Sequence, residues 1–340
     1  MRISIGIIAT VVVFAAMAQA STVFAPLALA LFVIALVSPV QFRLQARMPK
    51  LAALAITMTM TIAVGVAFAS MAAWAFGRVG RSFVTDAAHY QAIYDRAATW
   101  LDDRGISVAG LWAEHFNVSW LIRATQQATG RVNTTLVFWL VALIYATLGL
   151  LEVDEMRRKI ETLQNRDVAR VMLDASTVTA AKFRRYMLVR TQMSLLTGLF
   201  VGGFAAITGL QFAVEWGVIA FVMNYIPFIG PFIATLFPTL LAMTQFESWT
   251  AVLGIFICLN VIQFAIGSFL EPRVAGNVLS ISPSFVLFAV LLWTFLWGFF
   301  GAFIGVPISL AILSFCSQLP SARWIAELLG GSKAQDVAKR

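Results

Sequence analysis

Polar side chains that could bind a small solute stand next to two breaks in otherwise apolar sequence. Polar groups within long apolar segments cost free energy unless they face a partner or a cavity. Taken singly, each has a plain structural interpretation: Asn224 as a helix cap, Gln263 as a bridge between helices, and Glu271 with Arg273 as a surface pair. Taken together they favour a pathway for a small polar solute, lined by Asn224, Tyr225, Asn260, Gln263, Glu271 and Pro272.

Other chemistries lack the residue patterns that they need. The sequence contains no HExxH or GxSxG motif, no histidine within its apolar segments and no paired catalytic carboxylates, so we predict that the chain is not an enzyme and needs no cofactor. His89 and His115 have no ligand-like spacing with cysteine or carboxylate, and we predict no metal site.

The amino-acid composition indicates that the predicted solute pathway lies in a membrane protein. Of the 340 residues, 60% are hydrophobic and 12% are charged, whereas soluble domains have about 45–50% apolar and about 25% charged residues. The chain is therefore expected to be an integral membrane protein. Its net charge of +8 comes from basic residues beside apolar segments, which favours membrane orientation over nucleic-acid binding.

Charge-free windows predict the first membrane spans. The loop at 39–50 carries Arg43, Arg47 and Lys50 without an acidic residue, so it is expected to be cytoplasmic together with the N-terminus. The four spans predicted from these windows are 3–19, 22–38, 51–76 and 133–151.

Residues 1–20 also resemble a secretory leader, because the apolar run ends in "AQA" before Ser21. We favour an uncleaved first span, since cleavage would remove the helical partner of 22–38. Cleavage is the alternative.

Two polar segments are expected outside the membrane. Residues 78–132 predict a periplasmic amphipathic segment, whose apolar face is Phe83, Ala87, Tyr90, Tyr94, Ala97 and Leu101. Residues 152–187 hold eight Lys/Arg and six Asp/Glu and predict cytoplasmic amphipathic helices. Their basic residues Arg157, Arg158 and Lys159 are expected to contact anionic lipid head groups.

The breaks predict two re-entrant hairpins. The apolar runs 213–226 and 231–244 have 14 residues each, and about 21 Å of helix is too short for a hydrocarbon core of about 30 Å. Proline and glycine separate them, so 213–244 is expected to enter and leave on one side. The run 284–315 is similarly interrupted by Gly298, Gly301, Gly305 and Pro307.

Each hairpin follows a predicted span, 188–208 and 250–269, and the charge distribution puts the two units in opposite orientation. Secondary transporters place solute sites between such inverted repeats. The predicted fold is an all-α polytopic helical bundle with two re-entrant hairpins. It is divided into spans 1–3 (1–77), the periplasmic segment (78–132), span 4 (133–151), the cytoplasmic helices (152–187), a transport core (188–316) and a cytoplasmic tail (317–340). Eight full spans satisfy the same charge distribution.

Two stretches carry a family resemblance, "NYIPFIGPFIATLFP" and the segment from "LEPRVAGN" to "GVPISLAI". They resemble the AI-2E family of transporters, also known as the autoinducer-2 exporter or PerM-like permease family. The first pattern, N-I-P-x-I-G-P, falls on Asn224, Ile226, Pro227, Ile229, Gly230 and Pro231, with Tyr225 inserted. The second falls on Glu271, Pro272, Pro283, Trp297, Gly298, Gly301, Gly305 and Pro307.

The resemblance implies an inner-membrane homo-oligomer that exports a small molecule such as autoinducer-2 or exchanges cations for protons. Many relatives read Q-F-L-E-G-N where this chain reads Gln263-Phe-Ala-Ile266-Gly-Ser268. The missing acid argues against ion coupling at that position, and Glu215 and Glu271 are the candidates to replace it.

The first functional hypothesis is therefore alternating-access transport. Pro227, Gly230 and Pro231 would form one gate, and Gly298, Gly301, Gly305 and Pro307 would flank the other. An oligomeric passive channel and a non-transporting membrane assembly protein are the alternatives.

Overall fold

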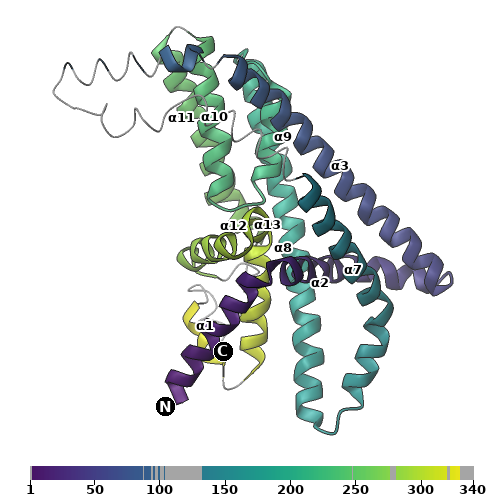
Figure 1. The fold of residues 1–340 in the computed structure, drawn as a ribbon. Helices are drawn as coiled ribbons and strands as arrows, with labels where there is room; N and C mark the ends of the chain where they lie inside the picture. Colours follow the sequence, from purple (N-terminus) through teal and green to yellow (C-terminus); the bar gives the residue numbers. More distant parts are fainter. Residues whose placement is uncertain are drawn as a thin grey trace.

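The computed structural model describes residues 2–86, 88–92, 95, 99, 103, 132–246, 248–275, 281–319 and 322–329. Within these residues the regular elements are helices, and the prediction of an all-α fold is confirmed for them (Figure 1). The predicted face at 83–101 is described only in part: the Phe83 and Tyr90 rings stack at 5.0 Å, whereas Ala87, Tyr94, Ala97 and Leu101 lie outside the described residues.

The helices follow the chain in an order close to the predicted one. They are α1 (Arg2–Gln19), α2 (Ser21–Gln45), α3 (Lys50–Thr85), α7 (Val132–Glu161), α8 (Arg166–Ile207), α9 (Ala213–Met223), α10 (Ile229–Gln245), α11 (Trp249–Phe264), the π-helix η1 (Ala265–Leu270), α12 (Glu271–Ala275), α13 (Pro283–Gln318) and α14 (Arg323–Leu329).

Six helices in the described part of the chain are long and apolar enough to cross a membrane. They are Ser21–Gln45, Lys50–Thr85, Thr135–Glu161, Arg166–Ile207, Trp249–Ala275 and Pro283–Gln318. The first five overlap the predicted spans two to six, and the last covers the residues of the predicted second hairpin. The predicted first span forms α1.

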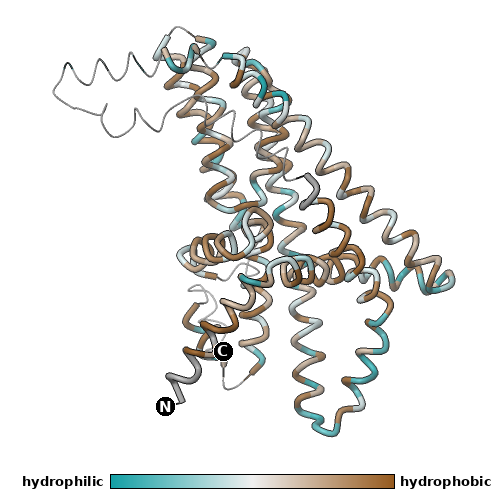
Figure 2. Tube along the Cα trace, in the orientation of Figure 1, coloured by the Kyte–Doolittle hydropathy of each residue, from teal (hydrophilic) through white to brown (hydrophobic). Residues whose placement is uncertain are grey.

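Helix α8 is the longest element and joins two predicted segments. It has 42 residues, so the predicted cytoplasmic helix before residue 188 and the predicted fifth span are one continuous helix. Its start is set by Asn165, whose side-chain oxygen accepts a hydrogen bond from the Val168 backbone N–H at 3.1 Å, as in a helix N-cap. Hydrophilic residues gather around the turn between α7 and α8 (Figure 2).

Small residues bring α9 close against α8. A Cβ atom on Gly198 would lie 2.7 Å from the Gly217 carbonyl oxygen, and one on Gly202 would lie 3.2 Å from the Gly217 Cα. The Gly198–Gly202 spacing therefore permits a close helix contact, as its sequence pattern suggests. The contact is made within the chain, to α9.

The residues of the first predicted hairpin form two helices of unequal length, and whether they are re-entrant stays a prediction. Helix α9 has 11 residues and α10 has 17, instead of the two runs of 14 expected. Residues 224–228 form the connection, and Figure 1 shows that it points towards the centre of the molecule, where α12 and α13 lie.

The second predicted hairpin lies within α13. Gly298 has φ 63° and ψ −142° there. Residues with a Cβ atom rarely adopt this backbone conformation, whereas glycine adopts it readily. The chain reverses at this glycine: the Trp293 indole N–H donates a hydrogen bond to the Ser309 hydroxyl at 3.1 Å, across the two arms.

Candidate functional site

A buried polar stripe runs along one face of α8. Tyr186, Arg190, Ser194 and Thr197 are all buried, and their spacing of three and four residues places them on the same side of the helix. We call these four residues the α8 polar stripe. They were absent from the sequence-based site, although Arg190 falls within the predicted span 188–208 and an ionisable residue there is itself a functional signal.

The tip of the first hairpin is bonded to this face of α8. The Asn224 side-chain amide donates to the Ser194 hydroxyl at 3.2 Å, and the Tyr225 hydroxyl donates to the Thr191 hydroxyl at 2.9 Å. Asn224 is buried, so leaving its amide without a partner would cost about 1–3 kcal/mol. The Asn224 bond fixes the broken end of the hairpin to the α8 polar stripe, and the Tyr225 bond fixes it to the neighbouring Thr191 of α8.

The end of the predicted sixth span reaches the same helix through an ion pair. Arg190 Nη1 lies 2.8 Å from Glu271 Oε1, and the two side chains are 6% and 18% exposed. The surface pair of Glu271 with Arg273, the structural alternative in the sequence analysis, is not the contact found here: Glu271 pairs with Arg190, and Arg273 is exposed. Arg185 adds a second link, because its guanidinium donates to the Val274 carbonyl at 3.2 Å.

Glu271 owes its position to an irregular helix. Residues Ala265–Leu270 form a π-helix, and the Glu271 backbone N–H bonds to the Ile266 carbonyl five residues earlier. Such segments occur frequently at functional sites, because one extra residue re-aims the side chains that follow. The segment includes Ile266, where the family resemblance leads us to expect an acid in relatives.

Aromatic rings connect the two hairpins over the Tyr225 ring. Phe303 of α13 stacks on Tyr225 with centroids 5.4 Å apart, and Phe221 and Phe68 contact it edge-on at 5.7 and 5.6 Å. Tyr225 therefore joins both hairpins and α3, while its hydroxyl faces α8.

In both hairpins a glycine lies in close contact with a backbone carbonyl group of the other arm. A Cβ atom on Gly230 would collide with the Met223 carbonyl oxygen, and one on Gly301 would collide with the Trp293 carbonyl oxygen. In each hairpin a glycine lets the second arm pass the backbone of the first. A Cβ atom on Gly305 would likewise crowd the Trp293 side chain at 3.0 Å.

The first tip also holds a strained residue. Phe228 has φ 64° and ψ −51°, and the Ile229 N–H bonds to the Pro227 carbonyl at 2.7 Å, which together define a rare γ-turn. Strain of this kind costs about 1–3 kcal/mol and concentrates at functional sites. Pro227 and Pro231, on either side of the turn, are half-buried.

Other predicted site residues lie apart from these contacts. Asn260 is exposed, and its amide bonds to the Phe256 carbonyl of its own helix. Gln263 has a buried amide nitrogen without a partner among the described residues. Pro272 and Gly298 are exposed, and Pro307 is buried within α13.

Glu215, the second candidate acid, forms a separate ion pair. It is buried and lies 2.8 Å from Arg78, whose side chain is half exposed. Both candidate acids are therefore paired, and only Glu271 belongs to the contacts around α8.

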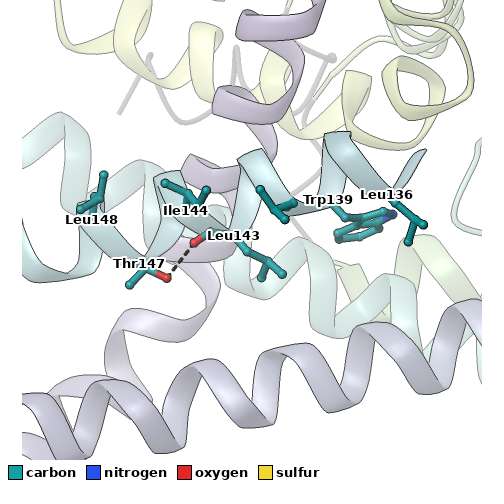
Figure 3. Close-up of a pocket in the computed structure, with 7 residues that line it drawn as sticks. Leu136, Trp139, Leu143, Ile144, Thr147 and Leu148 are labelled. Atoms are coloured by element: carbon teal, nitrogen blue, oxygen red, sulfur yellow. Dashed lines mark hydrogen bonds between the residues drawn. The ribbon is translucent and has the colours of Figure 1, made fainter. Parts of the chain in front are cut away.

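An apolar groove on α7 is distinct from this site. It has a volume of about 660 Å³ and is lined by Leu136, Trp139, Leu140, Leu143, Ile144, Thr147 and Leu148 (Figure 3). The Thr147 hydroxyl donates to the Leu143 carbonyl and is not free for a solute. Since a polar solute needs hydrogen-bonding partners, we place the candidate site at the α8 polar stripe.

The described fold and site define a multi-pass helical membrane protein in which two broken helix hairpins meet a buried polar face. Residues 7–321 match the sequence profile described as AI-2E family transporter. The chain therefore belongs to the AI-2E transporter family.

Curated relatives agree with this assignment. The chain is 25% identical to the AI-2 transport protein TqsA of Escherichia coli strain K12 over 325 residues, 94% of this chain and 92% of TqsA. It is 27% identical to a putative transport protein of Borreliella burgdorferi over 214 residues, 63% of this chain and 58% of that protein. It is 30% identical to the E. coli K12 putative transport protein YhhT over 148 residues, 44% of this chain and 40% of YhhT.

Proposed function

We propose that the protein is a secondary transporter of the bacterial inner membrane that exports a small polar solute, similar to AI-2, by alternating access. The observation that carries the proposal is that the tip of the first hairpin bonds to the α8 polar stripe through Asn224 and stacks on the second hairpin through Tyr225 and Phe303. Broken backbone in a membrane must be buried in protein or line a wet cavity, and transporters place it around the solute site.

In this proposal both hairpins are re-entrant and form an inverted repeat. Their tips act as gates, with Pro227, Gly230 and Pro231 at one and Gly298 and Gly301 at the other. The equivalent steric roles of Gly230 and Gly301 support the repeat. Opening one side would separate Tyr225 from Phe303 and leave the polar groups of α8 open to solute.

Membrane placement follows from charge. Both termini and the turn between α7 and α8 are proposed to be cytoplasmic, where Arg157, Arg158 and Lys159 would meet anionic lipid head groups. Arg157 and Lys159 already pair with Glu161 and Glu155 on the same helix. Assembly as a homo-oligomer is part of the proposal and rests on the family resemblance.

A proteoliposome assay with AI-2 as the solute tests this function. Wild-type protein is expected to give saturable flux that an excess of unlabelled AI-2 on the opposite side accelerates. Asn224→Ala should reduce flux about tenfold, because one buried hydrogen bond is worth about 1 kcal/mol or more. Asn260→Ala is the matched control and should leave flux unchanged, since that amide bonds only to its own helix.

Non-saturable flux with unitary currents in a planar bilayer would indicate a passive channel instead. Equal effects of Asn224→Ala and Asn260→Ala would remove the first hairpin tip from the pathway.

A further inference from the structure

The Arg190 side chain has a hydrogen-bond donor that lacks an acceptor among the described residues. Its side chain is 6% exposed, and its Nε lies buried without a hydrogen-bond partner among the described residues. A buried N–H without an acceptor costs free energy, more so on a charged group. The fold therefore keeps an unsatisfied cationic donor at the centre of the site described above.

The contact with Glu271 uses one nitrogen of the guanidinium. The recorded hydrogen bond joins Nη1 to one carboxylate oxygen at 2.8 Å. A guanidinium presents five donors in a planar fork, which carboxylates and phosphates match with two parallel bonds. The single bond to Glu271 leaves the Arg190 Nε donor without an acceptor among the described residues.

The groups around Arg190 suit a small oxygen-rich ligand. Ser194 lies one helical turn further along the same face of α8 and holds Asn224, and Tyr186 lies one turn before it. Basic residues nearby add positive potential: Arg184 donates to the Ala35 carbonyl and Arg185 to the Val274 carbonyl. Glu271 is the acidic side chain recorded in contact with Arg190.

Glu271 is attached where a helix can change its register. It follows η1 directly, and the π-type bond from Glu271 to Ile266 accommodates one extra residue in the turn. Conversion of this turn to α-helical bonding would rotate Glu271 by about 100° around the helix axis, the angle of one residue in a helix of 3.6 residues per turn. Glu271 can thereby leave Arg190 without unfolding α11.

We propose that Arg190 binds an anionic group of the transported solute, a carboxylate or a phosphate, and that Glu271 is the internal carboxylate that occupies Arg190 when solute is absent. The inference rests on the proposed function and names the substrate class of the same site. A buried arginine left alone would destabilise the empty protein, and an internal carboxylate solves this problem. The incoming anion then exchanges with Glu271.

Binding of small anions to the full-length protein in detergent tests this exchange. The probes are acetate and inorganic phosphate, with uncharged erythritol as the comparison, at constant ionic strength set with chloride. Calorimetry is expected to show binding of acetate or phosphate and none of erythritol. Glu271→Gln should bind the anion at least tenfold more tightly than wild type, because the internal competitor is gone.

Two further variants complete the design. Arg190→Lys should weaken anion binding at least tenfold, since lysine cannot form the planar double contact. Glu215→Gln is the matched control: it removes the acid of the other ion pair, with Arg78, and should leave anion affinity at the wild-type value. The double variant Arg190→Gln/Glu271→Gln removes both charges and should not bind anions.

The proposal is overturned if Glu271→Gln binds anions no more tightly than wild type, or if the double variant still binds them. Either result would make the ion pair a structural clamp between α8 and α12. Failure of this inference is separable from failure of the transport function, because AI-2 flux in proteoliposomes without anion binding would refute only the exchange. Anion binding without flux of either AI-2 or the bound anion would refute only the transport function.

Discussion

Replacing Gly301 with alanine is expected to abolish solute flux and to lower the thermal unfolding midpoint of the purified protein. The added Cβ would collide with the Trp293 carbonyl oxygen, an atom of the opposing backbone. Overpacking of this kind costs about 1–3 kcal/mol even where side chains can adjust, and a backbone carbonyl adjusts less than a side chain. Gly230→Ala is expected to act in the same way at the first tip, against Met223.

Glycines without neighbours provide the control. A Cβ on Gly254 in α11 or on Gly203 in α8 would meet no atom within 4 Å. Alanine at these positions is expected to stabilise the helix by about 0.5–1 kcal/mol, since glycine is the poorer helix former. Flux should persist in both variants. A Gly301→Ala protein with wild-type stability and flux would show that the arms of α13 do not approach each other as described.

Breaking the Arg190–Glu271 pair is expected to give the second large effect. Glu271→Ala leaves a buried guanidinium without its carboxylate and should destabilise the protein by about 3–5 kcal/mol. Adding Arg190→Met should recover most of this loss, because two apolar residues replace a buried pair with little cost. Unfolding of the two single variants and the double variant in mild detergent measures the coupling.

The Arg78–Glu215 pair is the comparison for the expected loss of stability in Glu271→Ala. The Arg78 side chain is 50% exposed, so after Glu215→Ala it can be hydrated, and the expected cost is about 1 kcal/mol or less. Equal costs for Glu271→Ala and Glu215→Ala would mean that Arg190 is as accessible to water as Arg78.

The helix breaks could be predicted from the sequence because their causes are local. Proline removes a backbone donor and glycine permits backbone conformations that other residues avoid, so both tips follow from residues 227–231 and 298–307. The unequal arms of the first hairpin could not be predicted, since the γ-turn at Phe228 and the position of Gly230 against Met223 depend on three-dimensional closure.

The polar stripe of α8 depends on contacts between residues far apart in the chain. Asn224 bonds to Ser194 across 30 residues, and Glu271 meets Arg190 across 81. Neither the hydropathy nor the helical period of residues 186–197 indicates which partner each polar residue has. The presence of Arg190 in a predicted span is a usable signal for a functional residue. The change from polar to apolar composition near residue 188 predicts an element boundary, whereas α8 continues through it.

The π-helix could also not be predicted from the sequence. The segment Ala265–Leu270 has no proline that would indicate an irregular turn. The pairing of Glu271 with Arg190, rather than with Arg273 two residues away, likewise required the structure.

Reversible cross-linking of the hairpin tips tests most directly whether the hairpins act as moving gates. Cysteines replace Tyr225 and Phe303, whose rings stack at 5.4 Å, in a background where the free thiols Cys258 and Cys316 are serine. A short bifunctional thiol reagent joins them, and a reductant releases them. We predict that flux in proteoliposomes stops on cross-linking and returns on reduction, relative to the same variant before treatment. Unchanged flux through the fully cross-linked protein would contradict the gating role of the hairpins.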